Sequence, residues 1–442
     1  MESLELFLTT VNKWLWGRWL VYVLLGLGIL YTFTNGFIQV RHFKFIIKKT
    51  LVDSFKTRND EKGSGSISTF KAMMVTLAGN VVGVATAVAA GGMGAVFWMW
   101  VAAFFGMALK YGEIVLSQLY RGKDSEGNLL SGPMYYIRDG LKAPWLGIVI
   151  AVLMCTKMMG ANLVQSNTIS GVLKSNYNVP TWLTGVILIC CLMAVVLGGL
   201  KRLANIATSL VPIMSIFYVV VGLLVILLNI QEVPGVFKEI FTQAFSMKAA
   251  AGGAGGYIIA RAMQYGITRG MYSNEAGEGT APFAHGSAIV DHPCEEGITG
   301  VTEVFLDTII ICSITAIVIG VTGIYQSDLS PAVMAIESFG TVWEPLKHLA
   351  TFALLLFCFT TLMGQWFNAA KSFTYAFGPK VTDKVRFVFP FLCIIGAITK
   401  ISLVWTIQDV AMGLVIIPNL IALIILFPQV SKQTKDYFSK QK

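Results

Sequence analysis

Long apolar runs recur along the whole sequence, and they constrain the fold more than any other feature. About eleven of them reach the roughly 20 residues that a helix needs to cross the hydrocarbon core of a bilayer. Hydrophobic residues make up 55% of the 442 residues and charged residues only 13%, a balance that soluble proteins do not have. We therefore expect an all-α, polytopic membrane protein with about eleven transmembrane helices.

The basic residues are divided unevenly between the two sides of such a bundle. If successive spans alternate in direction, the segments that share a side with the C-terminus hold roughly three times as many Lys and Arg as the other side. Basic loops stay in the cytoplasm, so we predict a cell-membrane protein with its N-terminus outside and its C-terminus cytoplasmic. These basic loops explain the net charge of +9, so the charge does not indicate that the protein binds nucleic acid.

Two of the apolar runs are rich in glycine. Leu77 to Gly92 reads LAGNVVGVATAVAAGG, and Met247 to Gly266 reads MKAAAGGAGGYIIARAMQYG. A helix that breaks inside the membrane leaves backbone groups without partners, at a cost of several kcal/mol each, unless something polar binds there. Close packing of two helices is the alternative explanation for one such run. A pair of interrupted segments indicates the binding site of a transporter.

The chain divides into repeats around these two segments. Without the first helix, ten spans remain, in two sets of five that each open with a glycine-interrupted helix. An odd number of spans inverts the second set relative to the first, which is typical of secondary transporters. The predicted units are an N-terminal helix with a basic cytoplasmic linker (1–67), a first repeat (68–230), an extracellular amphipathic connector (231–251), a second repeat (252–428) and a cytoplasmic tail (429–442).

Two spans carry a polar stripe. The fourth span contains Asn162 and Gln165 on one helical face, and the ninth contains Thr361, Gln365 and Asn368 at helical spacing. Polar faces within the membrane look into the bundle or a cavity, so we expect both stripes to face inward.

Several ionisable residues also fall within spans. Glu113 is predicted either to pair with a basic neighbour such as Lys110 or to line an ion path. Lys157 either pairs with a carboxylate or snorkels, or carries a coupling proton, because buried lysines change their proton affinity readily. The acidic loop with Glu275 and Glu278 is either solvated or latches onto Arg269 or the basic first loop.

Two short helices are expected between spans. Val236 to Phe245 has one apolar face and should lie on the outer surface. A second helix should start at Pro331, because proline favours the first helical position, and its place outside the membrane suggests a lid.

Other classes of function lack their motifs. The four histidines are scattered, and neither HExxH nor GxSxG occurs. No P-loop is present, so no ATP-driven mechanism is indicated. We expect neither an enzyme nor a resident cofactor, and a channel is disfavoured because no filter motif occurs.

Three strings resemble a known family. GVATAVAAGGMGAVFWMWVAAFFGMALKYGE, NLVQSN and YGITRGMYSNEAGEGTAPFAHG are similar to sequences of the alanine or glycine:cation symporters, from about Ser68 to Phe377. Members of this family resemble the amino-acid/polyamine transporters of leucine-transporter-like fold. The resemblance implies Na⁺-coupled uptake of small neutral amino acids such as alanine and glycine. The expected partners are thus the amino acid, Na⁺ and the lipid bilayer.

The broken helices suggest how a zwitterion would be held. Helix N-termini after Gly83 and Gly255 would direct N–H groups at its carboxylate, and free carbonyls near Ala78, Gly79 and Gly253 would accept from its ammonium or bind a cation. The predicted substrate site comprises Ala78, Gly79, Asn80, Gly83, Gln165, Gly253, Gly255, Gln365 and Trp366, of which Trp366 limits side-chain size.

The predicted Na⁺ site uses oxygen ligands. Its residues are Ala78, Gly79, Val82, Thr360 and Thr361, and the two threonines supply hydroxyls. Proton coupling through Lys157 and transport of another small zwitterion stay open as alternatives.

Overall fold

The computed structural model describes residues 2–17, 19–54, 67–77, 81–123, 129–245 and 254–440. These residues are mostly helical. The short strand β1 (Gly122–Lys123) pairs antiparallel with β2 (Leu129–Leu130). Four of the expected site residues, Ala78, Gly79, Asn80 and Gly253, lie outside the described residues.

The helices of the first half follow the apolar runs. They are α1 (Glu2–Trp16), α2 (Leu20–Thr34), α3 (Ile38–Arg41), α4 (Phe43–Ile47), η1 (Lys48–Asp53), α6 (Thr69–Thr76), α7 (Val81–Gly91), α8 (Gly94–Tyr120), α9 (Pro133–Tyr135), η2 (Tyr136–Gly140), α10 (Pro144–Tyr177), α11 (Thr181–Val196) and α12 (Gly199–Leu228).

The second half contains more short elements. They are α13 (Val233–Phe245), α14 (Ala254–Asn274), α15 (Ala281–His285), α16 (Pro293–Val304), η4 (Phe305–Cys312), α17 (Ser313–Thr322), η5 (Ile324–Gln326), α18 (Pro331–Gly340), α19 (Glu344–Phe377), α20 (Pro379–Val388), η6 (Phe389–Phe391), α21 (Leu392–Ile398) and α22 (Ile401–Ser439). The two short helices expected from the sequence correspond to α13 and α18.

Within the described residues, eight helical segments are long and apolar enough to cross a membrane. The sequence suggested about eleven, and the difference has local causes. Helix α11 has only 16 residues, α14 carries Arg261 and Arg269, and the tenth expected span is divided into α20, η6 and α21 around Pro390. The protein is therefore an all-α, multi-pass membrane protein.

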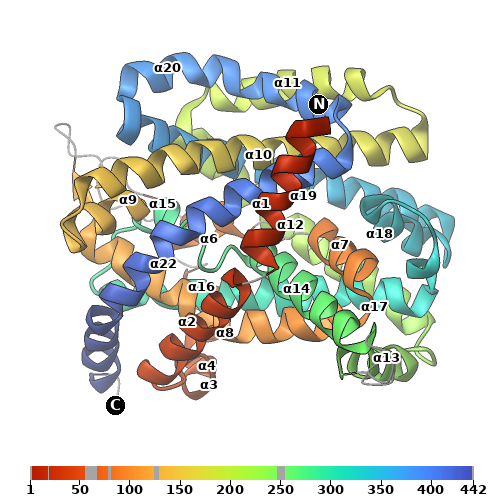
Figure 1. Ribbon diagram of the computed structural model, residues 1–442, viewed down its shortest axis with the longest axis horizontal. Coiled ribbons are helices and arrows are strands. Elements are labelled where there is room, and N and C mark those ends of the chain that lie inside the picture. Colours follow the sequence, from red (N-terminus) through yellow and green to blue (C-terminus); the bar gives the residue numbers. More distant parts are fainter. Residues whose placement is uncertain are drawn as a thin grey trace.

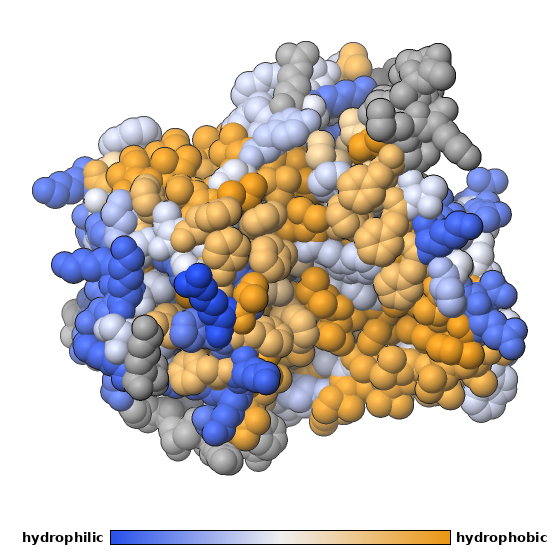
Figure 2. All heavy atoms as spheres, turned by 90° about the horizontal axis from the view of Figure 1, so that it is seen from below, coloured by the Kyte–Doolittle hydropathy of each residue, from blue (hydrophilic) through white to orange (hydrophobic). Residues whose placement is uncertain are grey.

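The helices pack into one bundle. In Figure 1, α10 and α19 run side by side across the upper half, and α22 descends diagonally across the bundle beside α1. Helix α10 packs against both α19 and α22, and α8 packs against α14 and α16. Figure 2 shows a broad hydrophobic area on one face, flanked by hydrophilic residues at both ends, as expected of a surface that contacts lipid.

The first glycine-rich run does not form one continuous described helix. Ser68 caps α6 by accepting a hydrogen bond from the Lys71 amide at 3.3 Å, and α6 ends at Thr76. Leu77 leaves the helical region with φ −79° and ψ 81°, and α7 begins at Val81.

The chain is also irregular after α14. Gly277 and Gly279 have φ values of +84° and +75°, a region that side chains with a Cβ rarely occupy. Beyond this turn the short helix α15 leads back into the bundle.

Candidate substrate and ion site

The end of α6 lies against α19. A Cβ added at Gly364 of α19 would come 3.1 Å from the carbonyl oxygen of Val75, so the missing side chain allows this close approach. Gln365 follows directly in sequence. The structure therefore brings the end of α6, just before the interrupted segment, next to the polar stripe of the ninth predicted span.

Thr360 and Thr361 lie one turn before this contact. Their hydroxyls donate to the carbonyl of Phe357 at 3.0 Å and 2.8 Å, which leaves the lone pairs of both oxygens able to bind a cation. Thr360 is buried against Met214 of α12 and Thr361 is half-buried. Oxygen ligands of this kind suit hard cations.

Buried amides line the neighbouring helices. Gln165 of α10 and Gln365 of α19 are 5% and 4% exposed. Among the described residues, the side-chain oxygens of Gln365, Asn368 and Gln408 have no hydrogen-bond partner. Buried amides normally have partners, so this group of helices can offer hydrogen bonds to a polar ligand. Gln408 of α22 was not predicted, because a single glutamine in an apolar run gives no periodic signal.

The two predicted broken segments meet through α7 and α14. Gly91 of α7 would place a Cβ 3.2 Å from the Cβ of Tyr265 and 3.3 Å from the Cα of Ala262. Val82 and Gly83 are buried in α7, and Gly255 lies in the first turn of α14.

Trp366 points toward a different space. Its ring lies 5.2 Å from that of Phe389, and it lines a cavity of about 300 Å³ together with Lys371, Arg386 and residues of the β1–β2 hairpin region. All the loops that border this cavity belong to the predicted cytoplasmic side. Trp366 thus forms part of the wall of a cavity on that side, and it directly follows Gln365 of the polar stripe.

The structure gives Lys110 and Glu113 other partners than the ones suggested from the sequence. Lys110 binds Glu303 at 2.9 Å and not Glu113. Glu113 instead accepts hydrogen bonds from the Gly277 and Gly279 amides and from Asn419. These partners come from segments distant in sequence, namely α16, α22 and the turn after α14, so local spacing gave the wrong pair.

The acidic loop is neither solvated nor latched onto Arg269. Glu278 pairs with Lys157 at 2.8 Å, and both side chains are 1% exposed, which confirms the paired interpretation of Lys157. Arg269 forms a bidentate pair with Asp409 of α22, at 2.6 Å and 2.7 Å, and lies over the ring of Trp405.

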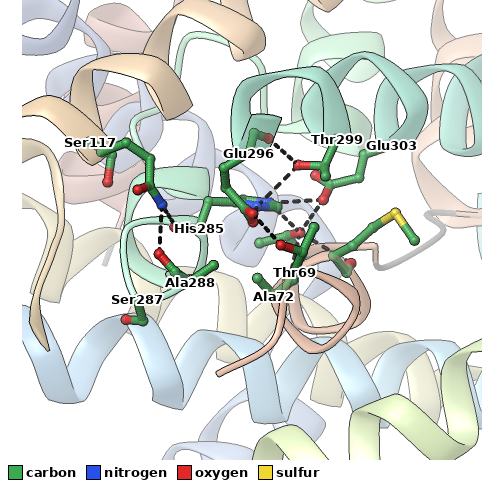
Figure 3. A network of polar contacts seen from close by, with 12 residues as sticks. Thr69, Ala72, Ser117, His285, Ser287, Ala288, Glu296, Thr299 and Glu303 are labelled. Atoms are coloured by element: carbon green, nitrogen blue, oxygen red, sulfur yellow. Dashed lines mark hydrogen bonds and ion pairs between the residues drawn. The ribbon is translucent and has the colours of Figure 1, made fainter. Parts of the chain in front are cut away.

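A second polar cluster, centred on His285, was not predicted (Figure 3). Its imidazole lies 2.7 Å from Glu296 through Nδ1 and 2.8 Å from Glu303 through Nε2. Thr69 donates to Glu296 at 2.7 Å, and Thr76 donates to Glu303 at 2.8 Å. One feature of the sequence could have indicated this cluster: Thr69 and Thr76 are seven residues apart, and so are Glu296 and Glu303.

Comparison with known proteins identifies the family. A family model described as the sodium:alanine symporter family matches residues 1–442. The chain belongs to the sodium:alanine symporter family. This membership confirms the resemblance and makes the protein a transporter that couples amino-acid uptake to a cation, and not an enzyme.

Individual members are similar over nearly their whole length. The sodium/alanine symporter AgcS of Methanococcus maripaludis is 37% identical, over 97% of this chain and 96% of its own. The probable sodium/glutamine symporter GlnT of Bacillus subtilis is 35% identical, over 100% and 92%. The putative sodium/proton-dependent alanine carrier protein YrbD of Bacillus subtilis is 32% identical, over 99% and 93%.

Proposed function

We propose that the protein imports small neutral amino acids, alanine and glycine above all, in symport with Na⁺. The observation that carries the proposal is the position of Thr360 and Thr361 on α19, one turn before the contact between Gly364 and the Val75 carbonyl. Neutral hydroxyl and carbonyl oxygens can hold Na⁺ without a full negative charge. The family and the relative AgcS, named for sodium and alanine, support the same ion and substrate.

The substrate would bind between α6, α7, α10 and α19. Gln165 and Gln365 supply buried amides there, and the N-terminus of α7 offers amide N–H groups to a carboxylate. A small amino acid matches the small residues of α7, whose sequence is VVGVATAVAAG. Trp366 would form the barrier toward the cavity on the cytoplasmic side during alternating access.

The arrangement favours Na⁺ over proton coupling through Lys157. Lys157 is held against Glu278 at 2.8 Å inside the bundle, and an ion pair of this kind resists loss of its proton because Glu278 would then be left unpaired. The lysine is therefore a structural group in this proposal.

Counterflow in liposomes tests the proposal. Purified protein is reconstituted into vesicles loaded with unlabelled alanine, and entry of radiolabelled alanine is measured in Na⁺ and in choline buffers. We expect accumulation only in Na⁺, with competition by glycine. Equal accumulation in choline that follows a pH gradient would contradict Na⁺ coupling, and accumulation of glutamine but not alanine would contradict the substrate.

A further inference from the structure

The His285 cluster holds a proton by its geometry. Both imidazole nitrogens lie within 2.8 Å of carboxylate oxygens, Nδ1 of Glu296 and Nε2 of Glu303. An ionised carboxylate only accepts hydrogen bonds, so both nitrogens must carry hydrogen. Neutral imidazole would leave a nitrogen lone pair facing a carboxylate oxygen. His285 is fully buried and Glu303 is 1% exposed, so water does not relieve that repulsion.

Charged groups on the surrounding helices balance the protonated form. The imidazolium and Lys110, which pairs with Glu303 at 2.9 Å, offset the two carboxylates. Other charged groups lie on the elements that pack against α15. Arg121 of α8 donates to the Ala288 carbonyl, and Lys371 of α19 donates to the Phe283 carbonyl. Lys71 of α6 is buried, and Glu113 of α8 accepts from the Gly277 and Gly279 amides.

The cluster joins α6 to α16 at two points. Thr69 and Thr76, seven residues apart at the two ends of α6, donate to Glu296 and Glu303, seven residues apart on α16. Equal spacing places the two pairs on facing stripes of the two helices. Thr76 also lies 3.1 Å from Nε2 of His285. It is the last residue of α6 and directly precedes the interrupted segment.

The cluster also has a route to water. A cavity of about 220 Å³ is lined by Thr69 of α6, together with Lys49, Asp53, Asp291 and Glu295. Thr69 is bonded directly to Glu296. The cavity is bordered by η1 and the loop before α16, both of which belong to the predicted cytoplasmic side. The Thr69 hydroxyl therefore links this cavity to the buried Glu296 carboxylate and offers a path for protons from that side.

We infer that His285, clamped between Glu296 and Glu303, is a proton-binding site whose occupancy sets how firmly α6 is docked on α16. With the proton bound, both carboxylates are free to accept from the α6 threonines. When the proton leaves to the cytoplasmic water, the bare nitrogen repels a carboxylate and competes for the Thr76 hydroxyl, and α6 loosens. The transporter would thereby respond to cytoplasmic pH at the helix that ends beside the substrate site.

The titration range follows from the surroundings of the imidazole. Burial alone lowers the pKa of His285, but Glu303 and Glu296 outweigh it and raise that pKa to about 9. His285 lies in α15, outside the eight candidate spans. The site is accordingly occupied at neutral pH and empties under alkaline conditions.

The first test reads the proton directly and does not depend on the transported substrate. The full-length protein is labelled with ¹⁵N-histidine, reconstituted in lipid and examined by solid-state NMR, with His285→Gln identifying the resonance. We expect the imidazolium form of His285 at pH 7.5, with loss near pH 9. A neutral imidazole at pH 7.5 would overturn the inference.

The second test asks whether the proton acts on transport, and its assay rests on the proposed symport. Because the ammonium group of alanine also loses its proton in this range, KM is expressed as the concentration of zwitterionic alanine. This KM in Na⁺-driven uptake should rise roughly tenfold from pH 8 to pH 10, as one group with a pKa of about 9 empties. Thr76→Val should abolish this rise while the NMR titration persists, and His348→Gln, at an exposed histidine stacked on Tyr177, should behave as wild type. A rise that persists in Thr76→Val and His285→Gln would overturn the link to α6. Absence of alanine uptake at every pH would instead refute the proposed function and leave the NMR result to decide the proton site.

Discussion

The Nζ atom of Lys157 lies 2.8 Å from Oε2 of Glu278, and both side chains are buried in the middle of the bundle. Helix α10 and the turn after α14 are thereby joined. Glu275 adds a second carboxylate 3.8 Å from the same ammonium group. The pair is thus positioned to fix that turn against α10.

Removal of one partner of this pair should destabilise the protein. Lys157→Met leaves Glu278 buried without a cation, a change that costs about 3–5 kcal/mol. The double variant Lys157→Met/Glu278→Gln should recover much of the loss. Thermal unfolding in detergent measures both. Any uptake that remains in Lys157→Met should still require Na⁺. If a pH gradient drove uptake by the wild-type protein and that uptake vanished in Lys157→Met, the structural role of Lys157 would be contradicted.

The two threonines of α19 should determine Na⁺ affinity. Thr360→Ala and Thr361→Ala each remove one proposed oxygen ligand. The double variant should therefore raise the Na⁺ concentration for half-maximal alanine uptake roughly tenfold, which corresponds to a loss of about 1–1.5 kcal/mol in the free energy of Na⁺ binding. Thr351→Ala on the same helix removes a hydroxyl that bonds the Lys347 carbonyl and serves as the control. Equal Na⁺ dependence in all variants would exclude these hydroxyls from the ion site.

Trp366 should restrict substrate size. Trp366→Ala should open the polar stripe toward the cavity of about 300 Å³, so larger apolar amino acids should compete for uptake. The KM for alanine should rise roughly tenfold, which corresponds to a loss of about 1.4 kcal/mol in the free energy of alanine binding. Competition assays measure both effects. Trp343→Ala, at a residue 57% exposed, is the control. An unchanged profile in active Trp366→Ala protein would place this ring in packing alone.

The predicted topology can be tested from outside the cell. Ser327 precedes α18 and Ser439 ends α22, and both are exposed. In a background without the exposed Cys190 and Cys191, an impermeant maleimide should label Ser327→Cys in intact cells. It should reach Ser439→Cys only after the membrane is opened. The opposite pattern would reverse the orientation and move both cytoplasmic cavities to the outside.

The stability of the folded protein should fall at alkaline pH. The pKa of His285 is raised from 6.5 to about 9, so its contribution is complete below pH 6.5 and is lost as the pH rises through 9. The loss is on the order of 3 kcal/mol. Thermal unfolding between pH 7 and pH 10 should show it in wild type, and His285→Gln should have a flatter profile. Parallel profiles would assign the alkaline loss to other groups.

The sequence alone determined that this chain is a helical, multi-pass membrane protein, and it predicted a break in the glycine-rich run, where α6 ends at Thr76 and α7 begins at Val81. Apolar length and helical period are local properties, and they depend on neighbouring residues only. The same reasoning located α13, the helix starting at Pro331, and the polar stripe of α19, whose residues are spaced by the turn of one helix. The short family strings added the class of transporter, which composition and periodicity do not contain.

Only the tertiary structure decided the partners of the charged residues. Lys110 stands three residues before Glu113 on α8, yet it binds Glu303 from α16, because the two helices pack at that level. His285 gave no motif in the sequence, since its partners Glu296 and Glu303 reach it only after the chain folds back through the turn that follows α14. Buried charges must find counter-charges wherever packing removes water, and that choice depends on contacts between segments far apart in the chain.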